Sequence, residues 1–430
     1  MKLRFQKYKL LELSLLAVYA ALIYLREPRF FLQPRFWAEE GTTHFYFAYS
    51  LHWFPALWHP VKGYLNFWAN FSTVLAARLV PLEHAPLVTT LMAFLVQVLL
   101  GAWIVTTPLA IANRWYKKAA MLAIVLVVPV TSEIWLNSIN SMEFLCVITF
   151  LILIESTQQA RFRRSAGYVL LALGGLSGLD SLLLAPFFFL RAWREKSRPR
   201  TVQTLILAGC GLVQLAIVLS ASGMGSLAYR FAGINSLGLR TMVIIFFTQS
   251  IGLLIAGFNQ MTALAVQLSL LDAANPFALK LVTLAILLFE IAFLVYLTLK
   301  LPPQERLFYA GSYLWLIMAL VFFSIDRDKS PYMTPGYGHR HFFAANAILG
   351  FLILANLDGS PGRRWKFRSL FAAALLGLAL FWGAIQFEPT LYRYPGWPSW
   401  PDQVAAWRLD PTRSLLIWPE TWKMYLKPHG

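Results

Sequence analysis

The feature that most constrains the fold of this chain is a series of apolar runs, several close to the roughly 20 residues that a helix needs to cross a bilayer. Such runs occupy, among others, residues 85–112, 201–222 and 277–299. Of the 430 residues, 58% are hydrophobic and only 13% are charged, about half the charged share of a typical soluble chain. Because this leaves too little polar surface for a soluble particle of this size, we expect an all-α polytopic membrane protein.

Basic residues are unevenly placed along the chain. The 37 Lys and Arg outnumber the 20 Asp and Glu, an excess that in a soluble protein would suggest nucleic acid. Here they cluster between the apolar runs, at residues 2–9, 114–118, 161–164, 191–200, 300–306 and 363–368. Such clusters mark cytoplasmic loops and orient membrane helices. We therefore expect membrane lipids and no nucleic acid as partners. For the basic residues that lie on the outer side of the membrane, we expect an anionic partner such as a lipid phosphate.

Pairing the apolar runs between these clusters predicts roughly 11 to 13 spans, an odd number, with the N-terminus cytoplasmic and the C-terminus outside. Small residues in the middle of residues 166–190 predict a hairpin of two short helices, with Asp180 near its outer tip. Residues 241–272 carry little to orient them, so a short hairpin and an interfacial segment are both compatible with the sequence.

The predicted organisation is one membrane module, residues 1–387, followed by a small tail, residues 388–430. The module includes a long first outer loop, about residues 26–84, in which we expect amphipathic helices. The tail is rich in Trp and Pro, and amphipathic rings favour the headgroup zone, so we expect a cap on the outer surface. The two cysteines, Cys146 and Cys210, both lie in apolar runs, which argues against a disulfide framework or a thiolate metal site.

The first outer loop carries an acidic pair, Glu39 and Glu40, directly after Trp37. A helical pattern is plausible from Glu39 to about residue 52, with both acids in its first turn. One interpretation is that they complement the N-terminal helix dipole. The other is catalysis, because charge is scarce in this chain and the pair stands beside an aromatic-rich membrane surface.

The histidines all fall in predicted outer segments, which places any titratable chemistry on that face. Glu40 and His44 are four apart, so on an α-helix they would share a face and could hold a divalent cation. An ordinary exposed pair is the more frequent explanation of that spacing. No cofactor is indicated with certainty, and a divalent cation remains open.

A second outer constellation surrounds Arg340, where the chain re-enters the membrane. Its members are Asp326, Asp328, Lys329, Tyr332, Tyr337, His339, Arg340 and His341. An interfacial Arg can simply extend its charge towards water. With two flanking His it can also hold a lipid phosphate through charge-assisted hydrogen bonds, and the sequence leaves both explanations open.

Little charge is left inside the apolar runs, where Glu290 is the clearest acid. A proton-coupled transporter usually needs ionisable sites near the membrane midplane. Asp180, between Gly178 and Ser181, is a good helix cap, and Glu143, which begins a predicted span, suits the helix dipole. Ionisable groups are therefore concentrated at one interface.

The layout of a first helix, a long outer loop with an acidic pair, many spans and an outer tail resembles the GT-C glycosyltransferases. These enzymes use polyprenyl-phosphate sugars and include protein O-mannosyltransferases and the aminoarabinose transferase of lipid A. Phe36-Trp37-Ala38-Glu39-Glu40-Gly41 resembles their acidic motif, although many members have Asp first. Residues 63–65, 175–178 and 339–342, which read Gly-Tyr-Leu, Gly-Leu-Ser-Gly and His-Arg-His-Phe, resemble segments of bacterial members.

The resemblance implies a GT-C-like fold and an inverting transferase that moves a hexosyl or pentosyl group on the outer face of a bacterial inner membrane. It implies that Glu39, or failing that Glu40, is the catalytic base. The acceptor would be a glycan, a lipid or a protein. Candidates to bind the donor phosphate are Arg340, His339, Lys62 and Arg78, and candidates to bind substrate are Trp37, His44, Tyr64 and Asp180.

Two other functional classes fit the same composition. A transporter or flippase of lipid-linked saccharides should show paired repeats and a polar transmembrane path. An O-antigen-type polymerase or ligase usually carries its largest outer loop in the second half of the chain, whereas here the long loop comes first.

Overall fold

The structure is a computed structural model that describes residues 2–129, 132–156, 160–232, 238–299, 301–323, 330–357, 363–387 and 396–427. It is 78% helical. Within the described ranges the only strands are β1 (Leu415–Leu416) and β2 (Lys423–Met424), a short antiparallel pair in the C-terminal tail. The predicted helical class is therefore confirmed.

The helices fall into long, short, π and 3₁₀ segments. The long ones are α1 (Lys2–Arg26), α5 (Phe67–Leu79), α6 (Ala85–Thr106), α7 (Trp115–Leu126), α8 (Ser141–Ile154), α9 (Arg161–Leu176), α10 (Ala185–Glu195), α11 (Arg198–Ala232), α14 (Phe258–Ala274), α15 (Pro276–Thr298), α17 (Ser312–Phe323), α18 (Phe343–Leu354) and α19 (Arg363–Ile385). The short ones are α2 (Arg29–Leu32), α3 (Tyr46–Ser50), α4 (Trp53–Leu57), α12 (Leu239–Phe246), α13 (Gly252–Ala256), α16 (Pro303–Arg306) and α20 (Trp400–Leu409). The π segments are η1 (Glu40–Phe45), η7 (Phe247–Ile251) and η8 (Leu307–Gly311), and the 3₁₀ segments are η2 (Leu82–His84), η3 (Ala110–Ala112), η4 (Ser132–Ile134), η5 (Asp180–Leu184), η9 (Ser330–Met333) and η10 (His339–Phe342).

Two short apolar helices, α8 and α18, lie at the centre of the molecule. On α8 every residue from Ser141 to Leu153 is buried, and every residue of α18 is buried. Helix α8 packs against α6, α9 and α18, while α18 also packs against α7, α17 and α19. A helix that is apolar on all sides can only be stable when it is surrounded in this way.

The outer helices expose apolar side chains. On α15, Leu284, Leu288 and Ile291 are each more than half exposed. Only 28% of the most apolar stretch of α15 is buried, and only 22% of that of α11. Contiguous apolar surface of this extent is typical of a protein whose outer helices face lipid.

Five helices in the described part of the chain are long and apolar enough to cross a membrane. They are Leu82–Thr106, Arg198–Ser220, Leu239–Ala256, Pro276–Thr298 and Phe367–Ile385. Three shorter apolar helices, Ser141–Ile154, Leu307–Ala319 and His339–Leu354, are too short by the same measure. Length and composition therefore account for five spans, where the sequence predicts 11 to 13.

Residues 166–190, where the sequence predicts a break, and residues 241–272, where it leaves two alternatives open, are each divided into more than one helical segment. Residues 166–190 form α9 and α10, which are separated at Gly178, where φ is +126°. Residues 241–272 form α12 to α13 and then α14, separated at Gly257, where φ is +84°. Because L side chains rarely adopt such angles, a glycine at each break lets the chain turn. In the second region the segment before Gly257, Leu239–Ala256, is long and apolar enough to cross a membrane by itself.

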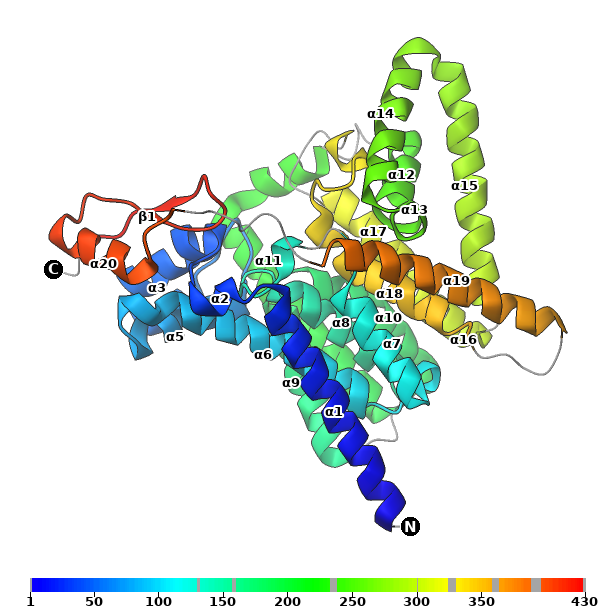
Figure 1. The fold of residues 1–430 in the computed structure, drawn as a ribbon, viewed down its shortest axis with the longest axis horizontal. Helices are drawn as coiled ribbons and strands as arrows, with labels where there is room; N and C mark the ends of the chain where they lie inside the picture. The colour runs from blue at the N-terminus through cyan, green and yellow to red at the C-terminus, as the bar shows by residue number, and fades with distance from the viewer. Residues whose placement is uncertain are drawn as a thin grey trace.

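The first loop and the tail share one hydrophobic core. Figure 1 shows α20 and β1 beside α2, α3 and α5. Phe36 and Phe45 from the loop pack in one cluster with Trp400 and Trp407 from the tail. The Arg35 guanidinium donates to the carbonyl of Leu416 at 3.0 Å and to that of Pro398. The tail therefore packs against and stabilises the loop that carries the acidic pair.

Candidate active site

A cleft opens where the first loop, the tail and the segment before α18 meet. Its volume is about 280 Å³. Its walls are formed by Trp37, Ala38, Glu39, Glu133, Tyr332, Tyr337, Gly338, Arg340, His341, Pro419 and Trp422. The fold thus brings Glu39 and Arg340, which are far apart in the sequence, into one cavity.

Glu39 lies immediately before η1, and its side chain is 18% exposed. Lys62 Nζ donates to Glu39 Oε1 at 2.5 Å. Burial alone would raise the pKa of Glu39, but the hydrogen bond and charge of Lys62, with a smaller contribution from Arg340, outweigh burial and hold this pKa below its usual value. Glu39 is therefore ionised at neutral pH.

The backbone around Glu39 is strained. Ala38 has φ of +37° and Lys62 has φ of +50°, both in the left-handed region that residues other than Gly rarely adopt. Such conformations cost about 1–3 kcal/mol each and persist only where surrounding contacts hold them. At Ala38 one such contact is with the tail, because its N–H donates to the carbonyl of Trp418 at 2.5 Å. The direction of the Glu39 side chain is thus set by contacts from a distant part of the chain.

Glu40, the second acid of the pair, points into the protein and is only 1% exposed. Its Oε1 accepts hydrogen bonds from the Ser138 N–H at 2.7 Å and the Ser138 hydroxyl at 2.6 Å. Its Oε2 accepts one from the Trp37 N–H at 3.1 Å. Burial raises the pKa of Glu40 while the bonds from Ser138 oppose that rise. Glu40 therefore ties the loop to the segment before α8 and does not line the cleft.

Arg340 stands in η10 beside His341, and its Nε donates to His341 Nε2 at 3.4 Å. The other ring nitrogen of His341, Nδ1, lies 3.6 Å from Oε1 of Glu143. Glu143 is fully buried in the first turn of α8, and neither of its carboxylate oxygens has a hydrogen-bond partner among the described residues. Burying an acid in this way is costly, so helix-dipole stabilisation alone is a poor explanation for Glu143.

Asp180 and Tyr64 belong to the same electrostatic group. Burial, assisted by the charge of Glu143, raises the pKa of Asp180 to about 7 against the opposing charges of His341 and Arg340. Burial likewise raises the pKa of Tyr64 to about 12, assisted by the charge of Asp180 and opposed by Arg340. Both side chains therefore lie within electrostatic reach of the cleft, although neither is part of its wall.

The candidate cation pair, Glu40 and His44, lies on η1, which is a π-helix. Its bonding pattern runs from i to i+5, so residues four apart do not stack as they would on an α-helix. His44 Nδ1 is 2.6 Å from Asn70 Oδ1, and burial lowers the pKa of His44 to about 4. Among the described residues no group of three or more His, Cys, Asp or Glu could hold a metal ion. His44 is thus a neutral buried group bonded to α5.

Two candidates for phosphate binding point elsewhere. Arg78 donates to the carbonyls of Ala48, at 3.3 Å, and Leu51, where it satisfies the C-terminal end of α3. Nδ1 of His339 contacts the carbonyl of Gly336, and the ring is not part of the cleft wall. Arg340 lines the cleft, and Lys62 is bonded to Glu39, which also lines it. These two cations are therefore the candidates that lie close enough to bind an anion in the cleft.

Three ionisable residues that the fold gathers here, Glu133, Glu143 and His341, were not among the candidate site residues, although the sequence placed His341 beside Arg340 and explained Glu143 by the helix dipole. The available signal for Glu143 was its position as the one acid in an otherwise apolar run. Asp326, Asp328, Lys329 and His429, which the sequence also drew attention to, lie outside the described residues.

Comparison with protein-family models, with curated proteins and with solved structures finds no match for this chain. The chemistry of the cleft has therefore to be argued from its own residues.

Proposed function

We propose that this protein is a membrane glycosyltransferase that moves a sugar from a polyprenyl-phosphate donor to an acceptor hydroxyl, with Glu39 as the base. The observation that carries the proposal is the cleft whose walls include both Glu39 and Arg340. A carboxylate and a guanidinium facing one cavity match the two charges that such a transfer develops, a proton released by the acceptor and a departing phosphate.

The proposed reaction needs only a base for the acceptor proton and a cation for the departing phosphate. The acceptor oxygen attacks the anomeric carbon, the bond between that carbon and the phosphate oxygen breaks, and the phosphate leaves with the electron pair. Glu39 takes the proton of the acceptor hydroxyl as attack develops. Because the acceptor displaces the phosphate directly, from the opposite face, the anomeric carbon is inverted. Because the phosphate is already a good leaving group, no strong general acid is required.

Arg340 and Lys62 would stabilise the departing phosphate. The planar guanidinium of Arg340 can bind two phosphate oxygens at once. Lys62 is half exposed and pairs with Glu39 in the structure. A donor phosphate would compete for Lys62, and its movement towards that phosphate would release Glu39 Oε1 to accept the proton. Trp37, in the cleft wall, offers an apolar face for the sugar or the isoprenoid.

The same proposal extends to the fold and the location. We infer a GT-C-like arrangement in which shorter helices such as α8, α17 and α18 also cross the membrane, towards the expected 11 to 13 spans. The cleft would open on the extracytoplasmic face of a bacterial inner membrane, with the N-terminus in the cytoplasm.

The test is sugar transfer by the purified full chain, assayed with a polyprenyl-phosphate sugar and a set of glycan, lipid and protein acceptors. Glu39→Gln should lower the rate of transfer by about 10² to 10⁴ while the melting temperature stays close to that of the wild type. Glu83→Gln is the matched control, because Glu83 is an ion-paired acid of the same loop that bonds to Arg408 outside the cleft. Full activity of Glu39→Gln would end the assignment.

The same assay separates the rival classes. A flippase would move the intact donor across a vesicle membrane without breaking the bond between sugar and phosphate. A polymerase or ligase would transfer an oligosaccharide from a diphosphate carrier in preference to a single sugar. Either result, without transfer from a monophosphate donor, would replace the proposed function.

A further inference from the structure

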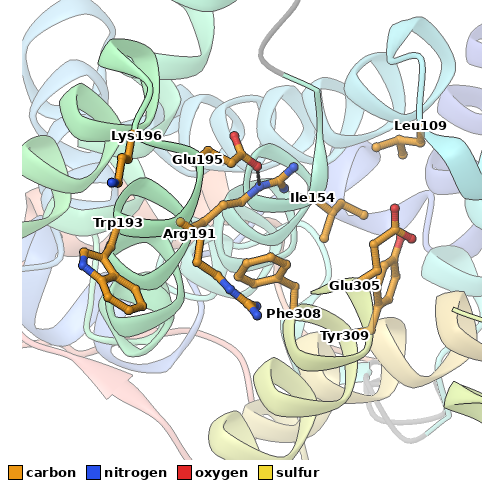
Figure 2. Close-up of a pocket in the computed structure, with 10 residues that line it drawn as sticks. Leu109, Ile154, Arg191, Trp193, Glu195, Lys196, Glu305, Phe308 and Tyr309 are labelled. Carbon is orange, nitrogen blue, oxygen red and sulfur yellow. Dashed lines mark hydrogen bonds and ion pairs between the residues drawn. The ribbon is translucent and has the colours of Figure 1, made fainter. Parts of the chain in front are cut away.

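A second cavity lies at the other end of the central helix α8. Glu143, beside the cleft, and Ile154, in the wall of this cavity, are eleven positions apart on α8, which corresponds to roughly 16 Å along the helix. The cavity has a volume of about 620 Å³. Its walls are Leu109, Ile154, Arg191, Trp193, Arg194, Glu195, Lys196, Glu305, Phe308 and Tyr309, and Figure 2 shows nine of them labelled. It is thus remote from the cleft and from the chemistry proposed there.

The cations of this cavity differ in how they are held. Arg191 is fixed, because its Nε donates to Glu195 Oε1 at 2.5 Å, one of its Nη atoms donates to the carbonyl of Leu153, and its guanidinium lies 5.3 Å from the ring of Phe308. Arg194 and Lys196 are exposed and have no ion pair among the described residues. The C-terminal end of α10, with its cap residue Lys196, thus offers one preorganised cation and two that are available to a ligand.

The two acids of the cavity neutralise only part of this positive charge. Glu195 is shared between Arg191 and the buried Arg200, which lies 3.0 Å from its Oε2. Glu305 stands across the cavity, on the side of Tyr309 in Figure 2, away from Lys196 and Trp193. One side of the cavity therefore keeps an excess of positive charge.

Exposed aromatic rings place this end of the molecule at headgroup level. Trp193 is 67% exposed at the cavity, and Trp115, at the start of α7, is 54% exposed. Helix α7 also carries Lys118, which lines an adjoining cavity together with Arg191. Tryptophan is enriched where hydrocarbon meets headgroups, so the anions that reach these cations most readily are those of lipids.

We propose that this cavity binds the phosphate of an anionic phospholipid headgroup, held by Arg191, Arg194 and Lys196 and covered by Trp193. Basic pockets between membrane helices on the side with excess Lys and Arg are suited to such headgroups. This site does not depend on the proposed transferase function, because none of its residues belongs to the cleft.

The experiment measures phospholipid retained by the purified full chain, using native mass spectrometry after incubation with phosphatidylglycerol or phosphatidylcholine in mixed micelles. The pocket variant is Arg194→Gln with Lys196→Gln. The matched control is Arg161→Gln with Arg198→Gln, which removes the same charge from exposed residues outside the cavity. A third arm adds inorganic phosphate to the lipid-free protein.

The wild type and the control should retain phosphatidylglycerol in preference to phosphatidylcholine. The pocket variant should retain at least about five-fold less phosphatidylglycerol, the loss expected for even one basic residue near an anionic headgroup, while its melting temperature without lipid is unchanged. Equal losses in both double variants, or equal retention of the two lipids, would overturn the proposal. Saturable binding of inorganic phosphate without phosphatidylglycerol retention would assign the cavity to a soluble phosphate and overturn the lipid assignment.

Discussion

The two ends of helix α8 carry charge in opposite ways. At the cleft the carboxylates are buried or held by hydrogen bonds, as Glu39 is by Lys62. At the basic end the cations Arg194 and Lys196 are exposed at the C-terminal end of α10. A charge that the fold buries and orients can act on a bound group with little reorganisation, whereas an exposed charge is screened by water and ions. A cluster of charged residues in a sequence is therefore a weaker indication of catalysis than a charged side chain that the fold buries and orients.

The comparison predicts the largest effect for a change that keeps the shape of the cleft and removes its proton acceptor. Glu39→Gln should lower the rate of sugar transfer by about 10² to 10⁴, the range usual for loss of a general base. The measurement is initial rate against donor concentration, with the change expected in kcat. Wild-type kcat in this variant would show that Glu39 is not the catalytic base, although it is buried and oriented at the cleft.

The neighbouring acid should affect stability first. Glu40→Ala removes the acceptor of three hydrogen bonds, two of them from buried backbone N–H groups. Leaving such groups unsatisfied costs about 1–3 kcal/mol, so the variant should melt several degrees below the wild type. Its loss of activity should follow its loss of folded protein. If Glu40→Ala instead kept full stability and lost only kcat, the roles of the two acids would have to be exchanged.

The buried acid Asp180 should make stability depend on pH. Its pKa is about 7 in the folded protein and 3.8 as an ordinary side chain, so between these values the folded state binds more protons than the unfolded state. Stability should therefore fall as pH rises from 5 to 7, by at most about 1.4 kcal/mol per pH unit. Asp180→Asn should flatten that slope in thermal melts, whereas Asp402→Asn, an exposed control, should not. A slope unaltered by Asp180→Asn would contradict the raised pKa.

The guanidinium of Arg340 should matter for its geometry as well as its charge. Arg340→Lys keeps the charge and loses the planar pair of donors, so we expect a roughly ten-fold rise in the KM for the donor, equivalent to about 1.4 kcal/mol, with a smaller change in kcat. Arg408→Lys, in an exposed ion pair with Glu83, is the control. Identical behaviour of the two variants would remove Arg340 from donor binding.

The smallest effect is expected at the basic end. Glu12 pairs with Lys118 at 2.8 Å and is 34% exposed. Lys118 is 15% exposed, so the pair is partly covered. Ion pairs near the surface contribute about 0–1 kcal/mol, so Glu12→Gln should shift the melting temperature by no more than a few degrees and leave transfer unchanged. A fall in melting temperature as large as that for Glu40→Ala would show that charges at the basic end contribute as much to stability as the buried charges near the cleft.

Much of the fold could be predicted from local sequence. Long apolar runs give helices because the backbone groups can be satisfied only within the segment in a membrane, and the breaks in residues 166–190 and 241–272 coincide with glycines. The number of spans was less accessible. Helices α8 and α18 are only 14 and 12 residues long, and whether a short apolar helix is buried by neighbours or crosses alone depends on packing.

The candidate site was predicted in part. The sequence indicated Glu39, Arg340 and Lys62, and the fold gathers these three. It also indicated Arg78 and His339, which the fold uses to satisfy backbone carbonyls. It gave little weight to Glu143, because an acid in the first turn of a helix has an ordinary explanation in the helix dipole. Only the packing around α8 shows that this carboxylate is buried beside His341 and Arg340.

The sequence by itself determined that this chain builds helices with apolar surfaces, because its composition leaves no other way to satisfy the backbone and cover the outside. It also placed an acidic pair in the first loop. Only the tertiary structure decided that Glu39 faces a cleft and Glu40 the interior, because adjacent residues on a helical turn point in different directions. Contacts with the tail determine that it is Glu39 that faces the cleft, because they hold Ala38 in a backbone conformation that no local preference would select.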